Sequence, residues 1–352
     1  MTRRGVMAAT VVCLLAGCGG GGNASQTQTE SATNGHIAFE RLRFQNSPLW
    51  GELFVMNADG TGVRKLTLPP NGTEDTNPDW SPDGSRLVFE RAPSTGAHSI
   101  WTVNSDGTGL RRLTPDCPPG AGVPTCRADD GWPVWSPDGK HIAFQRLTGA
   151  LRPNGATVND AKAIYKDELT IMDADGGHTR TLFWLGPWRG DPQAPAWSPD
   201  GKRLVFVGKF MNSKTNGTGC ECRALYVIDV DGSGLNRILP PGVEPGGRME
   251  WSPDGSVILF RTHPGDDSSG VGANLYTIHP DGIGLHQLTH FSSAEHVLEG
   301  SYSPDGRSIV FETSSGAVGS ALPDIFEMDA DGEGLHQITR TRNFETEADW
   351  GP

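Results

Sequence analysis

The pentapeptide Trp80-Ser81-Pro82-Asp83-Gly84 decides the fold, because it recurs along the whole chain. Four more complete copies, three opening with Trp and one with Tyr, begin at Trp135, Trp197, Trp251 and Tyr302. A truncated copy, Trp350-Gly351-Pro352, ends the sequence. The successive spacings are 55, 62, 54, 51 and 48 residues. A period of this length predicts a repeat architecture in which each unit is one supersecondary structure.

Most copies of the pentapeptide are followed by three more recurring segments. After Gly84 these are the apolar run Leu87-Val88-Phe89, the run from Ile100 to Gly107 that ends in Asp-Gly, and the short segment from Arg111 to Thr114. Together with the residues before each Trp, they predict four short strands in about 50 residues, which is the pattern of a propeller blade. A blade cannot bury both faces alone, so it must pack between two neighbours.

The two ends of the chain predict how the ring closes. Residues 36–67 supply the last three strands of a blade ahead of the first pentapeptide, and residues 347–350 supply a first strand with no successor. Pairing these terminal strands completes one blade and sets the number of blades at six. We therefore predict an all-β fold over residues 36–352, a six-bladed β-propeller with four antiparallel strands per blade, closed by pairing of the N- and C-terminal strands.

The chemistry of the pentapeptide predicts its local structure. Proline at the second turn position presets φ, and glycine at the fourth suits a type I turn with a glycine bulge. The aromatic residue that ends the preceding strand is expected to pack between adjacent blades, where a large ring covers the most apolar area.

Composition excludes nucleic acid as a partner and several classes of protein. The chain has 29 Lys and Arg against 42 Asp and Glu, a formal net charge of −13, whereas nucleic-acid binding requires clustered basic residues. Its 47 glycines and 26 prolines are too many for a helical bundle, and a hydrophobic content of 36% argues against disorder. After residue 15 no apolar run approaches the roughly 18 residues needed to span a bilayer. We expect a monomer that binds no nucleic acid.

The N-terminus predicts export and lipid attachment. Arg3 and Arg4 precede an apolar run from Gly5 to Leu15, which is too short for a membrane span. The sequence Leu15-Ala16-Gly17-Cys18 resembles the lipobox of bacterial lipoproteins. That resemblance implies a signal peptide over residues 1–17, an acylated Cys18 with a flexible tether over residues 18–35, and extracytoplasmic anchoring to the cell membrane. An ordinary secretory signal is the alternative, and the export route and the choice of inner or outer membrane stay open.

The repeated Trp-Ser-Pro-Asp-Gly followed by a run such as Ile142-Ala143-Phe144 resembles the TolB-type, WD40-like propeller repeat of bacterial envelope proteins. The resemblance covers residues 36–352 and implies a propeller that works in the cell envelope. The chain departs from the TolB pattern in one respect: about 17 residues separate Cys18 from the first expected strand, where TolB carries an α/β domain. This departure argues against a role in the Tol–Pal system.

The long connections are expected on one face of the propeller and the tight turns on the other. Long loops in a compact fold are usually functional. One of them contains Trp184, Trp188, Arg189 and Asp191, a mixture of indoles with an ion pair that is typical of interface hot spots. The alternative is that these indoles cap blade edges.

Charged residues shortly before each aromatic should approach the central channel. They are Asp75, Asp130, Asp191, Arg248, Glu299 and Glu347. A ring of carboxylates could bind a cation or a cationic peptide end, and the alternative is a hydrated acidic funnel without a dedicated ligand. No catalytic constellation, metal-ligand spacing or cofactor motif stands out, so we expect no catalytic residues, no metal and no cofactor.

Four cysteines remain beyond the lipobox. Cys117 and Cys126 lie in one loop and are candidates for a disulfide, which would contribute about 2–3 kcal/mol on the chain-entropy estimate. For Cys220 and Cys222 a strained disulfide and a metal site without further ligands both stay open.

The sequence favours a membrane-anchored, non-enzymatic β-propeller that binds an envelope protein or peptide through its long-loop face. The alternative is a propeller enzyme, or a small-ligand or cation binder, that uses the acidic channel mouth.

Overall fold

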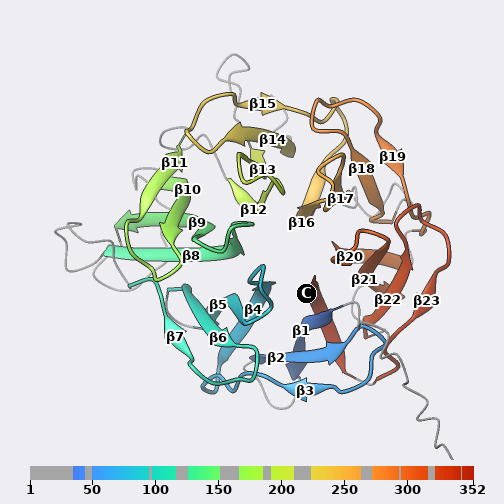
Figure 1. The fold of residues 1–352 in the computed structure, drawn as a ribbon, viewed down its shortest axis with the longest axis horizontal. Helices are drawn as coiled ribbons and strands as arrows, with labels where there is room; N and C mark the ends of the chain where they lie inside the picture. The colour runs from blue at the N-terminus through green and yellow to red at the C-terminus, as the bar shows by residue number, and fades with distance from the viewer. Residues whose placement is uncertain are drawn as a thin grey trace, which may run out of the picture. The chain divides into compact units, whose positions relative to one another are not determined.

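The computed structural model describes residues 35–43, 50–94, 97–115, 126–150, 166–184, 192–209, 223–262, 272–292, 295–315, 322–341 and 343–352. In this part of the chain, 24 strands form six four-stranded sheets arranged as blades around a central axis (Figure 1). No helix within these ranges is long and apolar enough to cross a membrane. The predicted all-β, six-bladed propeller is confirmed.

Each blade is an antiparallel sheet, and blade 1 takes its innermost strand from the C-terminus. Blade 1 consists of β24 (Phe344–Gly351), β1 (His36–Arg43), β2 (Trp50–Asn57) and β3 (Arg64–Lys65). Blade 2 consists of β4 (Thr73–Trp80), β5 (Arg86–Pro93), β6 (Ser99–Asn104) and β7 (Arg111–Arg112). Blade 3 consists of β8 (Cys126–Trp135), β9 (His141–Ala150), β10 (Lys166–Asp173) and β11 (Arg180–Phe183).

The other three blades repeat the same order. Blade 4 consists of β12 (Gln193–Trp197), β13 (Arg203–Lys209), β14 (Arg223–Asp229) and β15 (Asn236–Arg237). Blade 5 consists of β16 (Pro245–Trp251), β17 (Ile258–Thr262), β18 (Leu275–Ile278) and β19 (His286–Gln287). Blade 6 consists of β20 (Glu295–Tyr302), β21 (Ser308–Ser315), β22 (Asp324–Asp329) and β23 (His336–Gln337).

The ring closes by the strand pairing that the two chain ends predict. β24 runs antiparallel to β1, with Trp350 opposite Ile37 and Phe344 opposite Leu42. Figure 1 shows the C-terminus beside β1 near the centre of the ring. The closure of blade 1 by the N- and C-terminal strands is therefore confirmed.

Each pentapeptide forms the tight turn between the first and second strands of a blade. In blade 2 the Gly84 amide donates to the Ser81 carbonyl at 2.8 Å, and Gly84 adopts a φ of 66°, which favours glycine. The turn also touches the next blade: a side chain at Gly139 would meet the Cδ atom of Pro82 at 3.8 Å. The pentapeptide therefore couples adjacent blades as well as reversing the chain.

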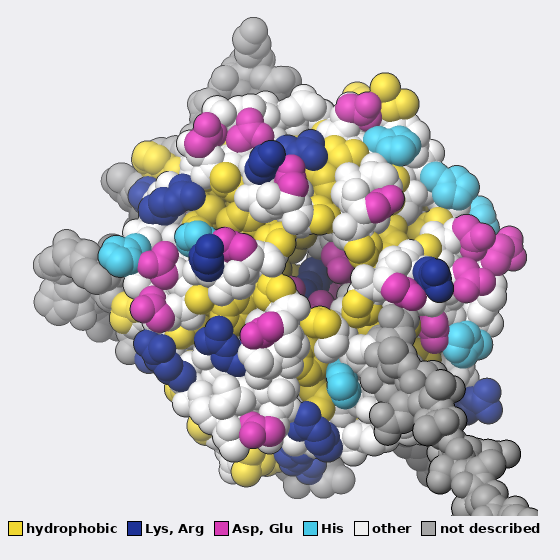
Figure 2. Space-filling model, viewed as in Figure 1, with side chains coloured by type: hydrophobic (Ala, Val, Ile, Leu, Met, Phe, Trp, Pro, Cys, Tyr) yellow, Lys and Arg dark blue, Asp and Glu magenta, His cyan; other side chains and the backbone are white. Residues whose placement is uncertain are grey.

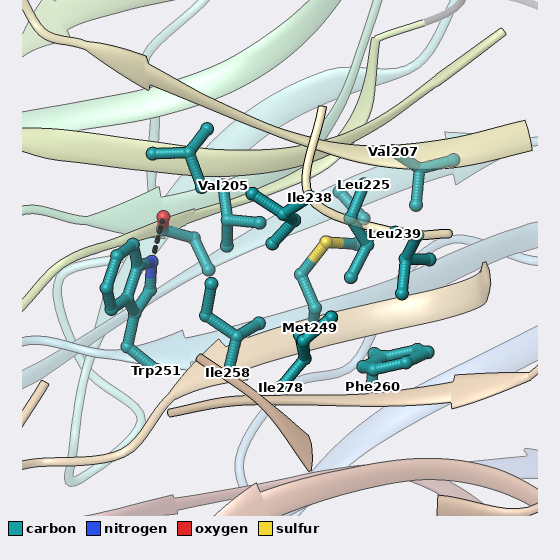
Figure 3. Close-up of a cluster of buried hydrophobic side chains, with 13 residues drawn as sticks. Val205, Val207, Leu225, Ile238, Leu239, Met249, Trp251, Ile258, Phe260 and Ile278 are labelled. Atoms are coloured by element: carbon teal, nitrogen blue, oxygen red, sulfur yellow. Dashed lines mark hydrogen bonds between the residues drawn. The ribbon is translucent and has the colours of Figure 1, made fainter. Parts of the chain in front are cut away.

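The aromatic residue that ends each inner strand packs between blades, as predicted. Trp80 lies in a buried cluster with Leu53 of blade 1 and Phe89 of its own blade. Figure 3 shows the equivalent cluster between blades 4 and 5, where the Trp251 Nε1–H donates to the Ala196 carbonyl at 3.2 Å. The core is therefore divided into repeated clusters, and each cluster needs two blades.

Every inner strand contains a β-bulge shortly before its aromatic residue, a feature that was not predicted from the sequence. In four of them the bulge contains a non-glycine residue with positive φ, namely Asn77 (50°), Trp132 (55°), Ala194 (47°) and Glu347 (56°). In five of the strands the bulge adds one residue to a strand of period two, so it exchanges the faces of the residues that follow it; in β16 the irregularity adds two residues. In those five strands, side chains five residues and one residue before the aromatic therefore point to opposite sides of the blade.

Candidate functional site in the central channel

One guanidinium crosses the centre of the ring. Arg248 Nη2, from blade 5, lies 2.8 Å from Asp79 Oδ1 of blade 2 and 3.0 Å from Asp349 Oδ1 of blade 1. Its Nη1 donates to the Pro78 carbonyl at 2.7 Å. Blades 5 and 2 are not neighbours in the ring, so this contact spans the axis. Figure 2 shows charged side chains of both signs at the floor of the central hollow.

Acidic side chains from four blades surround this guanidinium. We call them, with Arg248, the axial cluster: Asp79, Arg248, Glu250, Glu299, Glu347 and Asp349. Glu299 Oε1 accepts a hydrogen bond from the Arg248 amide at 3.3 Å, and Glu299 Oε2 is buried without a hydrogen-bond partner. The cluster therefore has one cation, several carboxylates and an unused acceptor.

The backbone of the neighbouring blade holds most of these carboxylates in place. Three acids that stand directly before an aromatic accept a hydrogen bond from the next blade: Asp349 from Trp80 N at 2.9 Å, Asp79 from Trp135 N at 2.7 Å and Glu250 from Tyr302 N at 2.9 Å. Glu347 projects from its bulge and accepts hydrogen bonds from Thr76 and from the Asn77 amide. The carboxylates are thus positioned by the propeller ring rather than by mobile side-chain contacts.

Burial dominates the electrostatics of the axial cluster. It raises the pKa of Asp79, Glu250 and Glu347 to about 8, and nearby carboxylates add to the rise. The pKa values of Glu299 and Asp349 are also raised by burial, and Arg248 opposes the rise in both. The neighbouring carboxylates raise the pKa of Arg248 although burial opposes its charge. The cluster therefore retains protons near neutral pH and keeps Arg248 charged.

These raised pKa values predict that the protein loses stability as the pH rises from about 4.5 to about 8. In this window folded Glu250, with a pKa of about 8, holds a proton that the unfolded chain has already lost. We expect Glu250→Gln to be close to the wild type near pH 5 and to be more stable by about 3–4 kcal/mol near pH 8. Thermal and urea unfolding across this pH range measure the difference. Asp254→Asn is the matched control, because the pKa of this turn carboxyl is lowered by hydrogen bonds from Ser252 and Ser256.

Asp75 and Asp130 do not join the axial cluster. The carboxylate of Asp75 accepts two hydrogen bonds from Arg91 at 2.6 and 2.8 Å, and that of Asp130 accepts the same pair from Arg146 at 2.6 and 2.8 Å. Both aspartates are fully buried. The expectation of one ring through all six positions is corrected here, because the bulge turns residues five positions before the aromatic to the other face.

The long-loop candidates lie mostly outside the described residues. Trp184 is described, is 44% exposed, and has the Lys166 ammonium 5.2 Å from its ring centre. The others outside the described ranges are Trp188, Arg189, Asp191, Cys18, Cys117, Cys220 and Cys222, and the side chain of Cys126 is likewise not described. Among the described residues, no three His, Cys, Asp or Glu side chains are placed to share a metal ion.

Three members of the axial cluster, Asp79, Glu250 and Asp349, were not predicted from the sequence. A signal for them exists, since each directly precedes the aromatic of its repeat. This signal can be interpreted only when the bulge is known, because the bulge turns these residues toward the axis.

Comparison with curated proteins finds partial matches. No family model matches the chain. The chain is 32% identical over 159 residues to the uncharacterized protein Atu1656 of Agrobacterium fabrum, covering 45% of this chain and 47% of that protein. It is 32% identical over 102 residues to the Tol-Pal system protein TolB of Thioalkalivibrio sulfidiphilus, covering 28% of this chain and 21% of TolB. The chain therefore spans less than half the length of these relatives.

Solved structures share the architecture over most of the chain. TolB from Acinetobacter baumannii superposes with a TM-score of 0.63 at 19% identity, covering 91% of this chain and 67% of that one. Oligogalacturonate lyase in complex with manganese gives 0.53 at 14% identity, covering 88% and 82%. At these identities the likeness shows the fold alone. The chain is a six-bladed β-propeller with the fold that TolB also has, as the resemblance of its repeated pentapeptide implies.

Proposed function

We propose that this propeller is an extracytoplasmic lipoprotein that binds a protein or peptide of the bacterial cell envelope and catalyses no reaction. The leader ending in Leu15-Ala16-Gly17-Cys18 supports the location and the anchor. The partial match to a Tol-Pal system protein supports an envelope role.

The axial cluster is the observation that carries the binding proposal. Its five carboxylates outnumber the Arg248 guanidinium and the nearby Arg261, and buried negative charge is costly unless protons or a cation neutralise it. A protein or peptide brings such a cation as a lysine, an arginine or a free amino terminus. Glu299 Oε2, which is buried and has no hydrogen-bond partner, is an acceptor for this group. The rest of the interface is assigned to the long-loop face, where Trp184 is exposed.

A panel of short cationic peptides, acidic peptides, sugars and divalent cations tests this proposal by thermal shift. Cationic peptides are expected to raise the melting temperature of the wild type and to have at least fivefold weaker effect on Glu299→Gln. A response to sugars or divalent cations alone, or substrate turnover, would instead support a small-ligand binder or enzyme that uses the same carboxylates.

The lipid anchor gives a separate prediction. Cys18→Ser removes the thiol that would carry the diacylglyceryl group, so the variant should leave the membrane fraction and lose label from a fatty-acid probe. A Cys117→Ser variant is the matched control and should stay with membranes. Continued membrane fractionation and labelling of the Cys18→Ser protein would contradict the anchor.

A further inference from the structure

Two of the six boundaries between blades share one contact over the aromatic residue. The residue that opens the second strand of one blade lies over the aromatic of the next blade. Arg86 Cζ is 4.9 Å from the ring centre of Trp135, and Arg203 Cζ is 4.9 Å from that of Trp251. A guanidinium over an indole face is a favourable cation–π contact. At two boundaries, the face of the indole is thus covered by an arginine side chain of the propeller itself.

Four boundaries have no arginine in this position, and at one of them His36 lies near Trp80 with ring centres 6.2 Å apart. The boundary between blades 3 and 4 differs from the other three in the exposure of its aromatic residue. Trp197 is partly exposed, whereas the equivalent Trp80, Trp135, Trp251, Tyr302 and Trp350 are only 3–7% exposed. The residue in the covering position is His141, whose ring is held at 3.9 Å from Asp138 and 3.8 Å from Asp173. A cavity of about 370 Å³ opens here, lined by both His141 and Trp197. A volume of this size accommodates a small ligand or a long side chain.

The cavity also has the carboxylate that accompanies the arginine at those two boundaries. Hydrogen bonds from Ser81 and Ser85 lower the pKa of Asp83, and the nearby Arg86 lowers it further. A hydrogen bond from Ser198 and the nearby Arg203 likewise lower the pKa of Asp200. Asp138 is the equivalent residue in blade 3; it lines the cavity and its side chain is 51% exposed.

Asp200 of blade 4 contributes a second carboxylate to the cavity wall. Arg180 is the basic residue of the wall, and its Nη2 donates to the Val230 carbonyl at 3.0 Å. Arg111 makes the same bond to the Asp175 carbonyl at 2.9 Å at the preceding boundary, so Arg180 is part of the structural framework. A cationic ligand would therefore meet the partly exposed Trp197 indole and two carboxylates, Asp138 and Asp200, each of which already accepts a hydrogen bond from the serine of its own turn.

We propose that this cavity binds the guanidinium of an arginine side chain presented by a partner protein or peptide. The guanidinium would stack on Trp197 as Arg86 and Arg203 stack on their indoles, with Asp138 and Asp200 as its counter-charges. The cavity is formed by the tight turns of blades 3 and 4, so it is separate from the axial cluster and does not depend on the function proposed for it.

Nuclear magnetic resonance of the indole Nε1–H of Trp197, assigned with Trp197→Phe, tests the proposal directly. The probe is Nα-acetyl-arginine methylamide, and the matched control is the citrulline analogue, which has the same shape without the charge. We expect a saturable shift of the Trp197 signal with arginine and a shift at least fivefold smaller with citrulline at the same concentration. Equal shifts with both, or none with arginine, would overturn the proposal.

Two variants separate this site from a general charge effect. His141→Arg places an arginine where Arg86 and Arg203 stand, so it should cover Trp197, weaken probe binding more than tenfold and raise the melting temperature. Asp138→Asn should weaken binding about threefold to tenfold, and it provides the test if His141→Arg does not fold. Asp254→Asn, which changes the equivalent turn carboxylate of blade 5 outside the cavity, should leave binding unchanged. Binding that persists in both His141→Arg and Asp138→Asn would contradict the assignment.

Discussion

Deletion of residues 345–352 is expected to leave the propeller largely unfolded. The deletion removes nearly all of β24, leaving β1 as an unpaired inner edge and removing Trp350, which is only 5% exposed. Loss of a buried tryptophan alone costs about 3–5 kcal/mol, against a total stability of about 5–15 kcal/mol for a typical domain. Circular dichroism and urea unfolding measure the effect.

Single substitutions test the same prediction in smaller steps. Trp350→Ala should keep the fold but lose about 3–5 kcal/mol of unfolding free energy. Leu68→Ala is the control, because Leu68 is 75% exposed and its loss should change stability by less than about 0.5 kcal/mol. A truncated protein that melts at the wild-type temperature would show that β24 does not close the ring.

Arg248→Met is expected to destabilise the protein strongly and in a pH-dependent way. The change removes the guanidinium that pairs with Asp79 and Asp349 and leaves those carboxylates buried together. Breaking a buried ion pair in this way typically costs about 3–5 kcal/mol. The cost should be largest near pH 8 and smaller near pH 5, because without Arg248 both carboxyls take up protons more readily and lose their charge at low pH. Urea unfolding at the two pH values measures it.

A second substitution tests the cause. Arg248→Met combined with Asp79→Asn should recover part of the lost stability near pH 8, since it removes one of the unpaired charges. Arg307→Met is the control, because Arg307 is exposed and lies 3.9 Å from Asp305 at a surface turn. A destabilisation that is equal at both pH values and not rescued by Asp79→Asn would mean that Arg248 acts through packing rather than charge.

The sequence predicted the fold because one signal is repeated in every blade. Trp80-Ser81-Pro82-Asp83-Gly84 and its copies specify a turn, a blade boundary and an aromatic core residue at once. The unmatched first strand at residues 347–350 then determined the blade count and the closure through β24. Each of these inferences depends on local chemistry that a period of about 50 residues makes visible.

The site was predicted less completely because a single inserted residue changes which side chains meet. Without a bulge, Asp75 and Asp79 would share a face; with it, Asp75 pairs with Arg91 and Asp79 meets Arg248. Glycine would have signalled the positive φ at these bulges, but Asn77 and Glu347 adopt it instead. The contact of Arg248 with blade 2 depends on the closed ring, and no local pattern around Arg248 encodes it.

Capture of envelope proteins by immobilised propeller variants tests the central claim, that partners bind at the axial cluster and the long-loop face. Glu299→Gln and Glu347→Gln should lose, by at least fivefold, the proteins that the wild type captures from detergent-solubilised envelopes, as quantified by mass spectrometry. Asp83→Asn and Asp254→Asn, in tight turns away from the cavity between blades 3 and 4, should cost less than about 1 kcal/mol of stability and retain those proteins. Retention by the two glutamine variants with loss from the two asparagine variants would contradict the account.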